Sequence, residues 1–157
     1  MYIKKSTIFS IEWFAGNLIY QNTDVIVNPA NVRLQHRRGA AQDIAQAAGP
    51  KLIKECKRYI EKNGELKTAQ VFCTSAGNLA PPIRHVLHVA GPDGRHTKNM
   101  SECSSLLADA FLNCLKYASD ILKCSSISLP AISAGRLFFG LPLNHWLFFQ
   151  ICRAVCF

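Results

Sequence analysis

Short apolar runs of strand length alternate along this chain with longer segments of helical period. An alternating run over residues 7–14 predicts a first strand, and a continuous β-branched run over residues 24–27 predicts a strand covered on both faces. The same signature predicts further strands over residues 69–74, 86–89 and 126–129.

Helical period fills the segments between these runs. Pro50 suits a first helical position, apolar residues then recur at helical spacing, and Asn63-Gly64 is a stop signal. A shorter helix is expected over about residues 41–48, and a long amphipathic helix over residues 106–118. Strands that alternate with helices predict one α/β layered domain over residues 1–157, with a mainly parallel sheet.

The two chain ends are apolar, but neither pattern fits a membrane segment. The stretch over residues 143–157 is interrupted by Arg153 and is too short to span a bilayer, so we expect a buried terminal helix there. Near the start, Glu12 lies inside the apolar stretch, which argues against a signal peptide. We expect no membrane partner.

The ends of the predicted strands are rich in small, turn-forming residues. Four runs lead into such turns, at residues 28–31, 75–77, 91–92 and 131–135. Ligands bind outside the carboxyl ends of parallel strands, and small residues there let backbone N–H groups approach a ligand closely. Helix N-termini that follow favour an anion, so phosphate is the natural candidate. The alternative is that these residues serve only to turn the chain.

The composition of the chain bears on its partners through net charge and on its redox state through its cysteines. Hydrophobic residues make up 49% of the 157 residues, which excludes wholesale disorder, and a net charge of +8 favours an anionic partner. The seven cysteines form no C-x-x-C pair and have no zinc-binding spacing with histidine. We therefore expect reduced thiols in an intracellular protein, with no disulfide framework, no metal and no cofactor.

A series of short motifs, in order and at the right spacing, resembles the macrodomain family. The motifs lie at residues 25–31, 34–41, 47–50, 55–56, 75–79, 85–92 and 126–135, and the match extends from about residue 14 to residue 142. The sequence around Leu34–His36 and Ala47–Cys56 is similar to that of the macrodomains of large multidomain poly(ADP-ribose) polymerases. The resemblance implies a three-layer α-β-α fold with a mixed, mainly parallel central sheet.

Against the family pattern, the chain stops at Phe157, and residues 143–157 are atypical. The resemblance therefore predicts a domain that lacks the usual last strand and helix, such as a truncated or alternatively spliced product. A sheet without a covering strand would expose an apolar edge, which predicts a marginally stable or aggregation-prone protein.

The resemblance implies that ADP-ribose binds in the crevice at the strand ends. Asn31 would contact the ribose distant from the adenine, unless its amide serves only as a turn cap. Gly39 and Ala40 would end a first phosphate loop, and residues 133–135 would form a second one. Phe139 would close over the diphosphate unless it is a core residue. The ligand-binding residues implied are Asn17, Leu18, Ala30, Asn31, Arg38, Gly39, Ala40, Ser133, Ala134, Gly135, Phe139 and Gly140.

Two departures from the family pattern affect this crevice. Asn17 stands where the family has an aspartate that accepts a hydrogen bond from the adenine, so the acceptor is kept but its charge is lost. Arg37 and Arg38 replace glycines whose positive φ an arginine adopts only at a cost. The two guanidinium groups either clasp the diphosphate or block the groove.

We expect a binding module for ADP-ribose or ADP-ribosylated proteins, in the nucleus or the cytoplasm. The alternative from the same resemblance is an ADP-ribosyl-protein hydrolase, with His36 and Asp43 as candidate catalytic residues. Two further alternatives are a degenerate domain without a ligand and a basic surface for nucleic acid or poly(ADP-ribose). The basic residues of that surface would be Arg33, Arg37, Arg38, Lys51, Lys54, Lys57, Arg58, Lys62 and Lys67.

Overall fold

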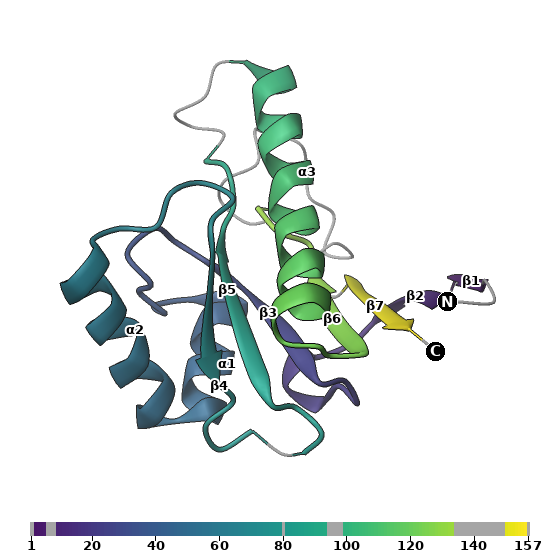
Figure 1. Cartoon of the computed structure of the whole chain (residues 1–157), viewed down its shortest axis with the longest axis horizontal. Coiled ribbons are helices and arrows are strands. Elements are labelled where there is room, and N and C mark those ends of the chain that lie inside the picture. The colour runs from purple at the N-terminus through teal and green to yellow at the C-terminus, as the bar shows by residue number, and fades with distance from the viewer. Residues whose placement is uncertain (1, 6–8, 80, 94–98, 134–149, 157) are drawn as a thin grey trace.

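A seven-stranded mixed sheet forms the centre of the protein. The computed structural model describes residues 2–5, 9–79, 81–93, 99–133 and 150–156. Figure 1 shows the sheet with its strands in the order β1-β2-β7-β6-β3-β5-β4. The strands are β1 (Tyr2–Lys5), β2 (Phe9–Ala15), β3 (Val25–Ala30), β4 (Val71–Ser75), β5 (His85–Ala90), β6 (Ser126–Pro130) and β7 (Gln150–Cys156).

Helices connect these strands at nearly the positions that the sequence predicts. They are α1 (Gly39–Ala48), α2 (Pro50–Asn63) and α3 (Met100–Lys116), with a 3₁₀ turn η1 (Leu18–Tyr20) and a π-helical turn η2 (Tyr117–Ile121) that extends α3. Pro50 begins α2, and Gly64 ends it with φ of 78°. No helix in the described part of the chain is long and apolar enough to cross a membrane.

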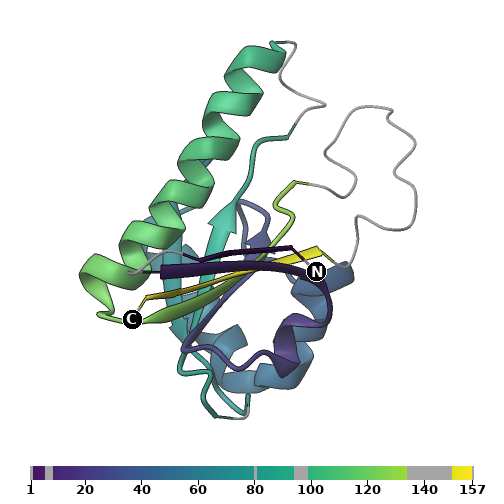
Figure 2. The ribbon, with the colours of Figure 1, turned by 90° about the vertical axis from the view of Figure 1, so that its right-hand side faces the viewer.

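The sheet is covered on both faces. Ile26 of β3 packs in one core cluster with Ile44 of α1 and Leu52 of α2. Its neighbours Val25 and Val27 point to the opposite face, into a second cluster with α3. Figure 2 shows α3 on one side of the strands and α1 on the other. This arrangement confirms the predicted three-layer α-β-α fold.

Strand direction corrects one prediction about the ligand edge. β3 pairs in parallel with β5 and β6, but β4 runs antiparallel to β5. The turn at residues 75–77 therefore lies at the opposite edge from the other three. It has a structural role there, because Ser75 donates from its N–H and its hydroxyl to Glu55 of α2, at 2.8 and 2.7 Å.

The C-terminal segment also differs from its prediction. Residues 150–156 form the strand β7, not part of a buried helix, and β7 pairs antiparallel with both β2 and β6. A strand therefore follows β6 after all and covers its edge. The outer strands of the sheet are β1 and β4, so the premise of a bare apolar edge beside β6 is wrong.

Candidate functional site

The parallel strands β3, β5 and β6 end at one edge of the sheet. Their registers align Ala30 with Ala90 and Ile26 with Ser128, so the turns after these strands are neighbours. The described turns at this edge are residues 31–38, 91–93 and 131–133. Ala134, Gly135, Phe139 and Gly140 lie outside the described residues, and their predicted roles stay predictions.

Asn31 organises the turn that follows β3. Its Oδ1 accepts hydrogen bonds from the N–H groups of Arg33 and Gln35, each at 3.0 Å, and its Nδ2 donates to the Gln35 carbonyl at 2.8 Å. A backbone bond from Leu34 N–H to the Asn31 carbonyl closes the same turn. The amide therefore holds the loop that leads to α1.

The first turn of α1 is open to an anion. Arg38 is the N-cap residue, but its side chain makes no capping hydrogen bond, and no acidic residue lies in the first turn. The first N–H groups of a helix have no partner within it, and the positive end of the helix dipole lies with them. Gly39, with φ of 60°, and Ala40 thus place backbone N–H groups of the helix start where the first phosphate loop is predicted.

The turns after β5 and β6 are packed tightly together. The buried Ser133 has φ of 60° and donates from its hydroxyl to the Pro92 carbonyl at 3.0 Å. A Cβ at Gly91 would fall on the Ser133 hydroxyl and on a methyl group of Ile132. These contacts fix the start of the predicted second phosphate loop against the end of β5.

The two arginines of the first loop carry no backbone strain. Arg38 is extended, with φ of −156°, and among the described residues 31–39 the left-handed conformation belongs to Leu34 and Gly39. The predicted cost of positive φ at Arg37 and Arg38 is therefore wrong. Both side chains are exposed, and Arg37 lines a pocket beside α1.

Asn17 is used locally, as the N-cap of η1. Its Oδ1 accepts a hydrogen bond from Ile19 N–H at 3.1 Å. Leu18, the next predicted ligand residue, is buried in the core beside α1 and contributes packing. Ala30 is also buried in that cluster, at the end of β3.

The two predicted catalytic residues, Asp43 and His36, lie in different environments. Asp43 is exposed on α1. The ring of His36 turns inward, with its Nδ1 at 3.3 Å from Asn28 Nδ2 and its centroid 5.4 Å from that of His88. Burial lowers the pKa of His36, which favours the neutral imidazole.

A buried polar cluster beneath the first loop is absent from the sequence predictions. His88, fully buried on β5, lies 2.9 Å from Asn28 Nδ2 through its Nδ1 and 2.9 Å from Thr74 Oγ1 through its Nε2. Burial, with the nearby His36, lowers the pKa of His88 to about 3. The neighbours of His88 in this cluster come from strands and a helix that no sequence spacing links.

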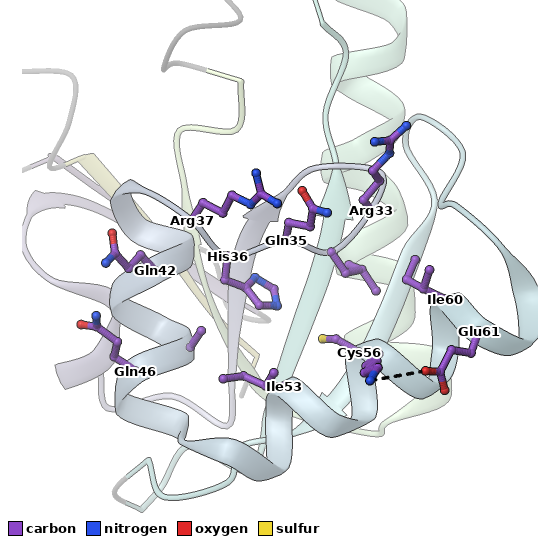
Figure 3. Close-up of a pocket in the computed structure, with 13 residues that line it drawn as sticks. Arg33, Gln35, His36, Arg37, Gln42, Gln46, Ile53, Cys56, Ile60 and Glu61 are labelled. Atoms are coloured by element: carbon purple, nitrogen blue, oxygen red, sulfur yellow. Dashed lines mark ion pairs between the residues drawn. The ribbon is translucent and has the colours of Figure 1, made fainter.

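A pocket of about 630 Å³ opens beside this cluster, between the first loop, α1 and α2. Figure 3 shows His36 and Cys56 facing it from opposite elements, with the Cys56 sulfur directed toward the His36 ring. Its rim is polar, with Gln35, Arg37, Gln42, Gln46, Lys57 and Glu61 among the lining residues.

Comparison with known proteins places this architecture in a family. The sequence model of the Macro domain matches residues 27–145, which include β5, β6 and most of β3. This chain belongs to the Macro domain family. The order β3-α1-α2-β4-β5-α3-β6 and the turn at Asn31 are thus features of a macrodomain.

Solved macrodomains confirm the fold. The Oceanobacillus iheyensis macrodomain with MES bound superposes with a TM-score of 0.72 at 32% identity, covering 83% of this chain and 74% of that one. A glycine-to-valine variant of that macrodomain, described with ADPR, has a TM-score of 0.72 at 36% identity, over 80% of this chain and 67% of the other.

Curated relatives come from two kinds of protein. The O-acetyl-ADP-ribose deacetylase of Escherichia fergusonii is 40% identical over 130 residues, 81% of this chain and 68% of that protein. The human protein mono-ADP-ribosyltransferase PARP14 is 36% identical over 130 residues, 83% of this chain but 7% of the transferase. The chain is therefore similar both to a human PARP-family protein and to bacterial proteins named O-acetyl-ADP-ribose deacetylases.

Proposed function

We propose that this macrodomain binds ADP-ribose at the edge where β3, β5 and β6 end. The observation that carries the proposal is the first turn of α1, the next element after β3, which has no side-chain cap and no acidic residue and carries the positive end of the helix dipole. A diphosphate supplies the negative charge that is favourable at a helix start and that no acidic side chain provides in this turn. Solved relatives described with ADPR and with ADP support the same ligand chemistry.

In this proposal Asn31 acts by holding the first phosphate loop in place. All three of its amide hydrogen bonds lie within residues 31–35, so their loss would let the loop leave the start of α1. The Ser133 hydroxyl does the same for the opposite loop through Pro92. Because the loop is already ordered before binding, less conformational entropy is lost when the ligand binds.

Calorimetric titration with ADP-ribose tests the proposal. The wild-type chain should bind one ADP-ribose, and Asn31→Ala should weaken binding about tenfold or more, since loss of such loop-holding bonds costs about 1–3 kcal/mol. Asn63→Ala is the matched control, because the exposed Asn63 also bonds a carbonyl four residues away, on Tyr59, at the far end of α2. Absence of binding by wild type, or equal losses in both variants, would overturn the proposal.

Hydrolysis of an ADP-ribose ester is the second candidate function. It is favoured by the 40% identity to a protein named an O-acetyl-ADP-ribose deacetylase. Incubation with O-acetyl-ADP-ribose and, separately, with a mono-ADP-ribosylated protein, followed by chromatography of free ADP-ribose, separates an enzyme from a binding module. Release that survives both His36→Ala and Asp43→Asn would exclude these two residues from the chemistry.

The partner in the cell is, in this proposal, an ADP-ribosylated protein, as the 36% identity to a protein named a mono-ADP-ribosyltransferase favours. The proposed location is the nucleus or the cytoplasm. The predicted basic surface is a separate anion site. Its helical part lies on the exposed side of α2, formed by Lys51, Lys54, Lys57, Arg58 and Lys62. Poly(ADP-ribose) or nucleic acid on that side would bind with a steep salt dependence, whereas a crevice ligand would not.

A further inference from the structure

Three potential metal ligands converge beneath the first loop. His36 lies on the loop before α1, Cys56 on α2 and His88 on β5, and one ligand atom from each lies within 4.8 Å of the other two. The residues are 20 and 32 positions apart in the sequence, so no motif spacing reveals them. The described structure places no carboxylate in this group.

The distances suit a small tetrahedral ion. Cys56 Sγ and His88 Nε2 are 3.8 Å apart. Two ligands of a tetrahedral zinc ion, one sulfur and one nitrogen, lie about 3.6 Å apart, given bonds of about 2.3 and 2.1 Å. His36 belongs to the loop before α1, whose position can adjust to bring its nitrogen closer to the ion, while Cys56 and His88 belong to packed elements.

The hydrogen bonds of the two imidazole rings allow each ring to offer its Nε2 atom to an ion. His36 Nε2 and Asn28 Oδ1 are buried without a partner in the described structure, which is costly for polar atoms. The Asn28 amide faces Nδ1 of both imidazoles, at 3.3 and 2.9 Å. With its oxygen turned toward them, the amide would accept a hydrogen from each ring, which leaves a lone pair on both Nε2 atoms. The His88 Nε2 lies 2.9 Å from the Thr74 hydroxyl, so an ion bound there would take the place of that hydrogen bond.

Access and ligand type are consistent with zinc. His36 and Cys56 line the pocket of about 630 Å³, so an ion can enter from solvent, and a fourth position faces that pocket. Among the abundant divalent cations, Zn²⁺ is the one that a ligand set of one thiolate and two imidazoles favours. Burial raises the pKa of the Cys56 thiol to about 12, with Glu55 adding to the effect, so the metal-free thiol is protonated and unreactive.

We propose that His36, Cys56 and His88 form a Zn²⁺ site, with the fourth position open to water in the pocket. The site lies on the α2 side of the first loop and does not depend on ADP-ribose binding at the strand ends. Binding of the ion would bridge the loop to α2 and β5 and would release the Cys56 proton to solvent.

Metal titration of the full chain tests this proposal. After treatment with chelator and reductant, the protein should bind one Zn²⁺ in competition with a chromophoric chelator. Co²⁺ in its place should show thiolate-to-cobalt charge-transfer absorption and the strong visible bands of a tetrahedral site. Both His36→Ala and Cys56→Ser should weaken Zn²⁺ binding by about 100-fold or more, beyond the loss typical of a residue that only orients a ligand.

Cys73→Ser provides the matched control. Cys73 is a half-buried thiol 3.9 Å from a histidine nitrogen, His85 Nδ1, but it has no third ligand among the described residues. This variant should keep the stoichiometry and the cobalt spectrum. No Zn²⁺ binding, a cobalt spectrum without thiolate bands, or full retention of binding in His36→Ala would overturn the proposal. His36→Ala changes an exposed loop, so it keeps the test valid if Cys56→Ser fails to fold.

Discussion

Single residues at the strand ends decide how closely the turns after β5 and β6 approach each other. Gly91 is the sharpest case, because a side chain there has no space between β5 and the turn at residues 131–133. A Cβ at Gly91 would clash with the Ser133 hydroxyl, which bonds to the Pro92 carbonyl. The absence of a side chain at Gly91 thus lets the two turns pack closely.

Gly91→Ala should therefore weaken ADP-ribose binding and lower the free energy of unfolding by about 1–3 kcal/mol, the usual cost of overpacking. Calorimetry and urea denaturation measure the two effects. Gly64→Ala is the control: it lies at the end of α2 in open space, with φ of 78°, so only backbone strain of about 1 kcal/mol is expected and binding should be unchanged. Normal binding by Gly91→Ala would contradict the described packing.

Asp24 fixes the opposite ends of the same strands. Its Oδ2 accepts hydrogen bonds from the N–H and hydroxyl groups of Ser125 and Ser126, and its Oδ1 pairs with Arg84 at 3.0 Å. Burial alone would raise the pKa of Asp24, but the bonds from Ser126 and Ser125 and the charge of Arg84 outweigh it and lower the pKa below its ordinary value of 3.8.

The lowered pKa gives a pH-dependent contribution to stability. The carboxylate stabilises the fold fully above the unfolded value of 3.8, and this contribution is lost as the pH falls through the lower folded value. Asp24→Asn should lower the free energy of unfolding by about 1–2 kcal/mol at pH 7, and the difference from wild type should shrink below about pH 4. Denaturant melts across this range test it, with Asp109→Asn, exposed on α3, as control. A difference that grows on acidification would contradict the assignment.

At the scale of elements, hydrophobic pattern predicts which segments are strands but not how they pair. The continuous apolar run at Val25–Val27 identifies a central strand, and the structure places β3 between β5 and β6. Direction is set by connections: β4 follows α2 and joins β5 antiparallel, which moves Ser75 to the other edge. The apolar C-terminal run fits helix and strand alike, so its pairing with β2 and β6 decides the outcome.

Proline in β7 tests its place in the sheet. Ala154 pairs with Ile11 of β2 and Ile127 of β6, so its strand is hydrogen-bonded on both sides. Ala154→Pro should destabilise the fold by about 3 kcal/mol or more, because proline removes a ladder bond inside a sheet. Lys4→Pro, on the outer strand β1, should cost far less. Equal effects on urea unfolding would exclude β7 from the centre of the sheet.

At the scale of the whole molecule, a charge of +8 attracts any polyanion, so affinity alone does not identify the crevice ligand. If ADP-ribose binds through backbone amides at the strand ends, its affinity should fall only slightly between about 50 and 200 mM salt. A polyanion on the face of α2 should lose far more over that range. Fluorescence competition between ADP-ribose and an oligonucleotide at both salt concentrations separates the two sites. Mutual displacement with one steep salt slope would contradict a distinct crevice.

The candidate site could be predicted in part from the sequence. The turn at Asn31 and the helix start at Gly39 are local features, and local sequence determines them. The cluster of His36, Cys56 and His88 depends on three elements that meet only in the folded chain, so no spacing indicates it. The same holds for the contact between Gly91 and Ser133.

The central claim is that main-chain N–H groups at the strand ends hold the ligand's phosphates. Amide-resolved NMR during titration with ADP-ribose tests it most directly. The largest shifts are expected at the N–H groups of Gly39, Ala40, Ala41 and Ser133, and they should saturate at one equivalent of ADP-ribose. Shifts confined to the exposed lysines of α2, or no shifts at the start of α1, would contradict it.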